Sequence, residues 1–151
     1  MLSSPNIRSA TPEDAETLTS LTNAAYEKYI PLLGRPPQPM TADYREMATN
    51  HPVWLLEWEG QPAGLLVLIP HPDHLLIYSI AIHPDYQRRG LGKTLLAWAE
   101  EQARQANLDE IRLYTNEKMA ANIALYQRVG YEITAREAYL GGVLVHMAKR
   151  L

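Results

Sequence analysis

Hydrophobic and polar positions change period several times along this chain of 151 residues, and each change marks a predicted element. Over residues 15–29 the apolar positions recur at helical spacing, after a start signal that combines threonine, proline and two acids. Pro31 and the proline-rich residues 34–40 end the helical signal, because proline cannot continue a helix. We therefore predict a loop there, followed by a short helix that Thr41 caps and that reaches residue 50.

The rest of the pattern alternates between strands and helices. Apolar runs bounded by glycine, proline or acidic turns predict strands, whereas apolar positions at three- and four-residue spacing predict helices. No repeat, low-complexity segment or linker interrupts this order, which indicates a single α+β domain over residues 1–151 with a mixed sheet. The predicted strands cover residues 6–9, 53–59, 62–69, 74–82, 110–115, 131–137 and 143–149, and the predicted helices cover 91–106 and 119–128.

Composition limits the classes of function. The net charge of −3 gives no reason to expect a nucleic-acid partner, so the basic residues that matter must act locally. The absence of cysteine excludes disulfides, thiolate metal sites and a cysteine nucleophile. The N-terminus lacks the charged start and apolar core of a signal peptide, and no apolar run is long enough to span a bilayer. We therefore expect a cytoplasmic protein without a membrane partner.

The stretch IHPDYQRRGLGKT, residues 82–94, lies between a predicted strand and a predicted helix and carries glycines and cationic side chains. Backbone N–H groups at such a helix start bind anions, so the segment indicates a phosphate site. A P-loop is excluded because its first glycine would fall on Gln87. A dinucleotide fingerprint is excluded because its third glycine would fall on Leu95. The phosphate must therefore belong to another ligand.

Two motifs resemble those of the GNAT N-acetyltransferase superfamily. Residues 87–92, QRRGLG, resemble its Q/R-x-x-G-x-G/A signature, which binds the pyrophosphate of coenzyme A, and residues 123–131 resemble its A-x-x-x-Y-x-x-x-G-[FY] region. The resemblance implies an α+β fold in three layers, α/β/α, around a mixed and mostly antiparallel central sheet. It also implies an N-acetyltransferase that takes acetyl-CoA as co-substrate and lets a primary amine attack the thioester directly in a ternary complex.

The resemblance further implies which residues hold acetyl-CoA. Glycines without Cβ atoms let the backbone close on the pyrophosphate, while arginine and lysine add positive charge to an otherwise acidic protein. Backbone groups of the fourth strand would hold the pantetheine arm. Many relatives carry an asparagine at the place of Met119, so that contact has shifted to Asn116 or Asn122, or has been lost. The residues expected to bind acetyl-CoA are Ile80, Ala81, Ile82, Gln87, Arg88, Arg89, Gly90, Leu91, Gly92, Lys93, Thr94, Asn116 and Asn122.

By the same resemblance, Tyr126 is the catalytic residue and protonates the coenzyme A thiolate as it leaves. A backbone N–H near Ile82 would stabilise the oxyanion. No general base is assigned, because Tyr114 stands where some relatives have a glutamate. Four side chains on or beside the fourth strand remain as candidates that could act through a water: His74, Tyr78, Ser79 and His83.

The remaining expectations concern partners. Residues 26–40 border the acceptor site by resemblance, and the acceptor is expected to be a small-molecule or peptide amine, although the composition of this segment names no substrate. The five histidines lack metal-ligand spacing, so no metal is expected. A homodimer is left open. Two alternatives also stay open: a non-catalytic acyl-CoA-binding or sensor module of the same fold, and a basic-loop protein-interaction domain.

Overall fold

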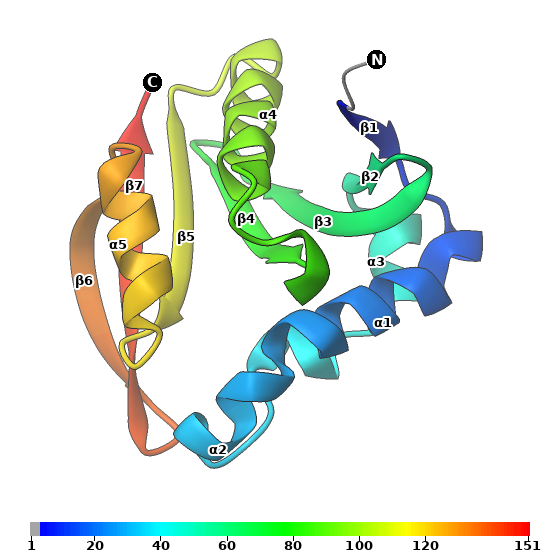
Figure 1. Cartoon of the computed structure of the whole chain (residues 1–151). Helices are drawn as coiled ribbons and strands as arrows, with labels where there is room; N and C mark the ends of the chain where they lie inside the picture. The colour runs from blue at the N-terminus through cyan, green and yellow to red at the C-terminus, as the bar shows by residue number, and fades with distance from the viewer. Residues whose placement is uncertain (1–3) are drawn as a thin grey trace.

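The computed structural model describes residues 4–151, which form one mixed sheet of seven strands in the order β1-β2-β3-β4-β5-β7-β6 (Figure 1). Neighbouring strands are antiparallel except for β4 and β5, which are parallel. Residues 1–3, part of the stretch assessed for signal-peptide character and of the predicted domain, lie outside the described residues. The strands are β1 Pro5–Ser9, β2 Val53–Trp58, β3 Gln61–Pro70, β4 Leu75–Ile82, β5 Glu110–Asn116, β6 Glu132–Tyr139 and β7 Gly142–Arg150.

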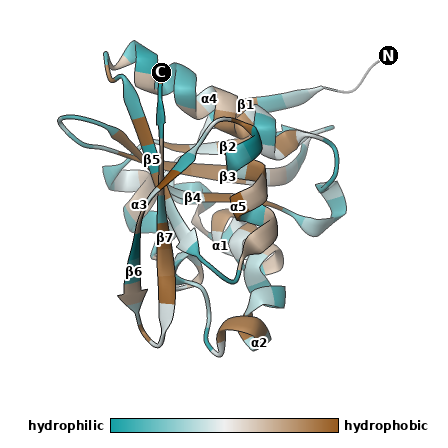
Figure 2. Ribbon diagram, turned by 90° about the vertical axis from the view of Figure 1, so that its left-hand side faces the viewer, coloured by the Kyte–Doolittle hydropathy of each residue, from teal (hydrophilic) through white to brown (hydrophobic). Residues whose placement is uncertain are grey.

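Helices cover both faces of this sheet and produce the three predicted layers (Figures 1 and 2). One face is covered by α1 and α3, whose buried side chains include Leu18 and Tyr44. The other face is covered by α4 and α5, which contribute Leu95 and Tyr126 to a separate core. The predicted fold class is therefore confirmed. The helices are α1 Ala15–Tyr26, α2 Ile30–Leu33, α3 Tyr44–Asn50, α4 Leu91–Gln105 and α5 Ala120–Arg128.

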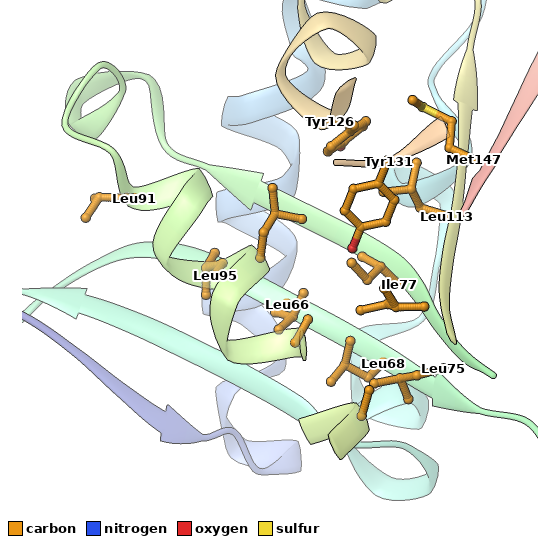
Figure 3. Close-up of a cluster of buried hydrophobic side chains, with 14 of the residues drawn as sticks. Leu66, Leu68, Leu75, Ile77, Leu91, Leu95, Leu113, Tyr126, Tyr131 and Met147 are labelled. Atoms are coloured by element: carbon orange, nitrogen blue, oxygen red, sulfur yellow. The ribbon is translucent and has the colours of Figure 1, made fainter. Parts of the chain in front are cut away.

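The central strand β3 is apolar on both sides because helices cover both faces of the sheet. Four consecutive residues, Leu65 to Leu68, are at most 1% exposed, and they alternate between the two cores. Figure 3 shows the larger core, in which Tyr131 points toward Ile77 of β4 and Tyr126 lies beside Tyr131. This continuous packing holds α5 and its tyrosine in a fixed position relative to β4.

β4 changes direction in its middle. The register of β3 on β4 shifts between Val67 and Leu68, which leaves Tyr78 as an extra residue in β4. Such a bulge bends a strand and increases its twist. β4 pairs with β5 only through Leu75 and Leu76, at its beginning. Among the described residues, the second half of β4 therefore has no strand partner on the β5 side.

The segment after α1 differs from the prediction. The helix expected over residues 15–29 ends at Tyr26, and a 3₁₀ turn, Glu27–Tyr29, follows it. Pro31 was expected to lie outside helical structure, yet it lies in the first turn of α2. Proline is tolerated there, because the N–H that it lacks would have no partner within the helix. The chain then turns back toward the sheet.

The cap of α3 was also predicted wrongly. Thr41 belongs to a 3₁₀ turn, Gln38–Thr41, inside the expected loop, and its Oγ1 donates to the Gln38 carbonyl at 2.7 Å. Asp43 caps the helix instead, since its Oδ1 accepts from the backbone N–H groups of Arg45 and Glu46 at 3.1 and 3.2 Å. Aspartate is as good an N-cap as threonine, so the choice depended on where the turn ends.

Candidate active site

The second half of β4 presents unused backbone donors where β5 has separated from it. The His83 N–H donates to the Ala63 carbonyl of β3 at 2.8 Å. Because main-chain groups alternate in direction along a strand, the N–H groups of Ile80 and Ile82 face away from β3. Their carbonyls are already bonded: Tyr26 Oη donates to Ile80 at 2.7 Å, and the Gln87 side chain donates to Ile82 at 3.1 Å. The two N–H groups remain for a ligand.

The loop after β4 ends at the N-terminus of α4 with a series of free N–H groups. Gly90 is the N-cap in the left-handed conformation, with φ +76°, and Arg88 is also left-handed, with φ +66°. Thr94 closes the first turn, because its N–H and its Oγ1 both donate to the Gly90 carbonyl at 3.1 Å. No residue in 4–151 accepts from the N–H groups between Arg88 and Lys93. Such a concave array of donors binds anions.

The positive charge of this loop is not neutralised within the chain. Arg88, Arg89 and Lys93 are exposed, and none of them forms an ion pair with a carboxylate of residues 4–151. The Arg89 guanidinium lies over the rings of Trp58 and Tyr86, 5.5 and 5.7 Å from their centroids. These cation–π contacts fix Arg89 beside the loop while leaving its edge N–H groups free.

The glycines of the loop have different surroundings. A Cβ atom on Gly90 would meet nothing within 4 Å, so the backbone is open to a ligand on that side. A Cβ atom on Gly92 would lie 3.5 Å from a methyl of Leu125, an ordinary contact. Leu91 is 3% exposed and belongs to the core, so it can offer a ligand only its backbone. The residues present therefore fit a pyrophosphate bound mainly by backbone groups.

A cavity of about 350 Å³ lies beside the β4 bulge. Four of the predicted site residues line it: Ile80, Asn116, Asn122 and Tyr126. The other predicted residues, namely Ala81, Ile82 and Gln87 to Thr94, do not line it. Ala81 is buried in the core on the α1 side. The structure thus divides the predicted site into a cradle at the start of α4 and a cavity between β4 and β5.

Tyr126 reaches the cavity from α5 and is 6% exposed. Its ring lies against Tyr131, with centroids 6.1 Å apart and planes tilted by 60° (Figure 3). Burial raises the pKa of the Tyr126 hydroxyl above its usual value, so the phenol holds its proton more strongly than an exposed tyrosine does. The hydroxyl makes no hydrogen bond with residues 4–151. It is therefore available to donate a proton to a group in the cavity.

The two asparagines differ in their freedom. Asn116 Oδ1 accepts from the Lys118 N–H at 3.0 Å, which uses the side chain to form a turn. Asn122 lines the cavity and makes no side-chain hydrogen bond with residues 4–151. Met119 is buried, and its sulfur accepts from Thr115 Oγ1 at 3.3 Å. Asn122 is consequently the freer of the two amides.

Two of the four base candidates lie outside the cavity. His74 stacks on His71 and bonds to Asp73 at 2.7 Å, while His83 accepts from the Asp85 N–H at 3.1 Å. Neither histidine lines the cavity.

Tyr78 and Ser79 do line it, together with Tyr114. Burial, with smaller contributions from nearby tyrosines, raises the pKa of Tyr78 to about 12. Burial likewise raises the pKa of Tyr114, whose hydroxyl donates to Gln38 Oε1 at 3.4 Å. Among residues 4–151, no aspartate, glutamate or histidine lines the cavity.

The rim of the cavity includes residues that the sequence did not single out. Lys118 and the tip of the β6–β7 hairpin, with Tyr139 and Leu140, line it together with the segment after α1. Arg35 Nη2 donates to the Leu140 carbonyl and ties the two sides together. The Gly141-Gly142 pair lies between the predicted strands 131–137 and 143–149 and, in the sequence alone, indicates only a turn. Its closeness to Arg35 depends on packing between distant segments, which periodicity does not report.

The described residues offer neither a metal site nor a membrane-spanning helix. Residues 4–151 contain no group of three or more histidine, aspartate or glutamate side chains placed to hold a metal ion. No helix in that part of the chain has the length and apolar character needed to cross a membrane.

Comparison with known sequences identifies the family. The sequence model of the Acetyltransferase (GNAT) family matches residues 17–131. YvbK of Bacillus subtilis (strain 168), an uncharacterised N-acetyltransferase, is 30% identical over 105 residues, covering 69% of this chain and 66% of YvbK. The ribosomal protein bS18-alanine N-acetyltransferase of Escherichia coli (strain K12) is 37% identical over 85 residues, covering 56% of this chain and 57% of that enzyme. In both cases the match spans less than two thirds of the relative's length.

Solved structures share the fold over nearly the whole chain. PaiA N-acetyltransferase from Thermoplasma acidophilum, in complex with coenzyme A, has a TM-score of 0.82 at 17% identity, covering 98% of this chain and 99% of PaiA. The Escherichia coli ribosomal-protein-S18-alanine N-acetyltransferase has a TM-score of 0.79 at 21% identity, covering 97% and 94%. The family match over most of the sequence, on a fold common to these structures, shows that this chain belongs to the GNAT family of acetyltransferases.

Proposed function

We propose that this chain is an acetyl-CoA-dependent N-acetyltransferase and that residues 1–151 form its single domain. Acetyl-CoA is a substrate of the reaction and supplies an activated acetyl group. The amine nitrogen bonds to the acetyl carbonyl carbon and the carbon–sulfur bond breaks. The amine loses one proton and the departing thiolate gains one, so the products are an N-acetyl amide and free coenzyme A.

One observation carries this proposal: two sets of unused backbone donors meet at the end of β4. The N–H groups of Ile80 and Ile82 face the space that β5 leaves, and those from Arg88 to Lys93 face the start of α4. The seven residues from Gln87 to Lys93 include three cations and no acid. This chemistry suits a ligand with a pyrophosphate at one end and an acyl thioester at the other.

The residues near the thioester have separate roles in the proposal. Tyr126 holds a proton on a buried phenol and gives it to the thiolate. The Ile82 N–H donates to the carbonyl oxygen as negative charge develops there. Asn122 offers a free amide to the pantetheine arm. None of these roles requires a change in the packing of β4 against α4.

The proposal also concerns the acceptor, a primary amine of a small molecule or a peptide. The Escherichia coli relative is named for acetylating an alanine of ribosomal protein bS18, and its match with this chain covers 57% of its length. That name supports amine acetylation as the reaction class.

Binding and turnover test different parts of the proposal. At about 100 times the dissociation constant, acetyl-CoA should stabilise the fold by about 2.7 kcal/mol, which raises the melting temperature by roughly 5–10 °C. Thiol release in the presence of amines should follow, and the absence of cysteine removes protein thiols as background. A melting shift without acetyl transfer to any amine would favour the non-catalytic sensor. No shift at millimolar acetyl-CoA would refute acetyl-CoA binding.

A further inference from the structure

We propose that the acceptor is a free α-amino acid with an apolar or aromatic side chain, whose carboxylate is held by Arg35 and Lys118 at the rim of the cavity. The inference rests on the proposed acetyl transfer and adds the class of acceptor. It draws on the charges of the cavity wall, its size and its aromatic lining.

The rim carries two cations and no opposing acid. Arg35 Nη2 donates to the Leu140 carbonyl, and Lys118 Nζ lies 3.5 Å from the Leu32 carbonyl. Both partners are neutral carbonyls, and neither cation forms an ion pair with a carboxylate of residues 4–151. Each keeps further N–H groups for a ligand, since a guanidinium has five and an ammonium three. Two unpaired cations on one cavity favour an anionic group on the acceptor.

The two cations lie on elements that the fold brings together. Arg35 follows α2, whereas Lys118 lies between β5 and α5. Figure 1 shows α2 beside the turn between β6 and β7, and the Arg35–Leu140 hydrogen bond joins these segments. A Cβ atom on Gly141 would lie 3.7 Å from Arg35 Nη2, an ordinary contact distance, so this turn lies directly beside the guanidinium. The two cations therefore come from segments far apart in the chain and line the same cavity.

The absence of an acid also decides which amines can react. The attacking amine must be neutral, and an ammonium in this cavity would meet no carboxylate or histidine among the described wall residues. In an amino acid, the substrate's own carboxylate stabilises the ammonium. Pairing that carboxylate with Arg35 and Lys118 removes this stabilisation and lowers the pKa of the amine. Polyamines lack such a group, and their additional charges would be repelled by the same cations.

The remaining wall suits an apolar side chain of limited size. Tyr78, Tyr114 and Tyr139 line the cavity together with Pro37. A volume of about 350 Å³ is near the lower end of small-molecule sites and must also admit the acetyl group. These dimensions favour a free amino acid over a bulky polar acceptor.

The test compares phenylalanine with two analogues that lack a free carboxylate and with a polycation. Thiol release from acetyl-CoA is measured with phenylalanine, phenethylamine and phenylalaninamide, and with spermidine as a polycation. We expect kcat/KM to be about tenfold higher for phenylalanine than for phenethylamine. In Arg35→Gln and Lys118→Gln the ratio of these two values should fall toward one. Arg45→Gln, which removes an exposed cation from α3, is the matched control and should keep the ratio.

The outcomes separate this inference from the reaction itself. Faster turnover of phenethylamine or spermidine than of phenylalanine would overturn the acceptor assignment and leave acetyl transfer intact. An unchanged ratio in both rim variants would overturn the role of Arg35 and Lys118. A preference for phenylalaninamide over phenylalanine would instead indicate a peptide terminus. Failure to acetylate any amine despite bound acetyl-CoA would overturn the proposed function, and this inference with it.

Discussion

Replacing Tyr126 with phenylalanine isolates the proposed proton donor. The change removes one hydroxyl, and the ring can keep its contact with Tyr131, 6.1 Å between centroids. The hydroxyl has no hydrogen-bond partner among residues 4–151, so the free energy of unfolding should change by no more than about 0.5 kcal/mol. Any larger effect on activity then belongs to the reaction and not to the fold.

The size of the effect follows from the role of the proton. General acid catalysis contributes about 10²-fold or more, so kcat should fall by about that factor, which corresponds to about 2.7 kcal/mol of transition-state stabilisation. The KM for acetyl-CoA should hardly change, because the cradle from Arg88 to Lys93 is untouched. A thiolate can leave without assistance, so some activity should remain. Single-turnover rates are the appropriate readout, since slow product release would hide a change in chemistry.

Tyr131→Phe provides a matched control. The Tyr131 hydroxyl is buried without a hydrogen-bond partner among residues 4–151, and Tyr131 does not line the cavity. Its removal should leave the rate unchanged and should keep or increase stability, because a buried unpaired hydroxyl costs about 1 kcal/mol or more. Equal single-turnover rates in Tyr126→Phe and the parent protein would refute the acid role. An equal loss in both variants would indicate a packing effect.

Three further predictions test the cradle, the acceptor and the fold. Gly92→Val should abolish the acetyl-CoA-induced melting shift while the variant stays folded, because branching beyond a Cβ that already lies 3.5 Å from Leu125 would displace the first turn of α4 and its N–H groups. Ala97→Val, on an exposed position of α4, should keep the shift, and normal affinity in Gly92→Val would mean that the phosphates bind elsewhere. For each acceptor, kcat/KM should rise with pH around the pKa of that amine, since no acid or histidine of the described wall is available as a base and burial raises the pKa of Tyr78 to about 12. The same apparent pKa for all acceptors would contradict this. Asp14→Asn should lower stability at neutral pH by about 1 kcal/mol, because the hydrogen bond from Arg8 holds the Asp14 pKa low; that loss should shrink in denaturation curves below about pH 4, and a constant difference would be inconsistent.

Patterns of period two and of helical spacing were sufficient to predict the order of strands and helices, whereas the three layers were implied by the resemblance to a known family. The apolar stripe of α4 follows directly from the order of its residues, whereas β4 is a nearly continuous apolar run whose alternating exposure the order does not reveal. The segment after α1 could not be predicted in the same way. Pro31 is compatible both with a loop and with the first turn of a helix, and only the docking of this segment decides between them.

The cradle could be predicted from the sequence, whereas the cavity could not. The cradle is local, because a strand, two glycines and a helix start lie within a few residues of one another, so a sequence motif indicates it. The cavity is assembled from segments far apart in the chain, and its position depends on the bulge at Tyr78 and on the Arg35–Leu140 contact. Whether a given histidine or tyrosine reaches it is a property of packing. His74 and Tyr78 were equal candidates in the sequence, and only Tyr78 lines the cavity.

The most direct test of the account is to measure both products of one reaction mixture. The purified chain is incubated with acetyl-CoA and an amine, free thiol is determined by a colorimetric reagent, and the N-acetyl amide is determined by mass spectrometry. The account predicts one amide per thiol, with both products dependent on the amine and on the protein. Thiol release without amide would show that water and not an amine accepts the acetyl group, and formation of neither product with a full panel of amines would contradict an acetyltransferase.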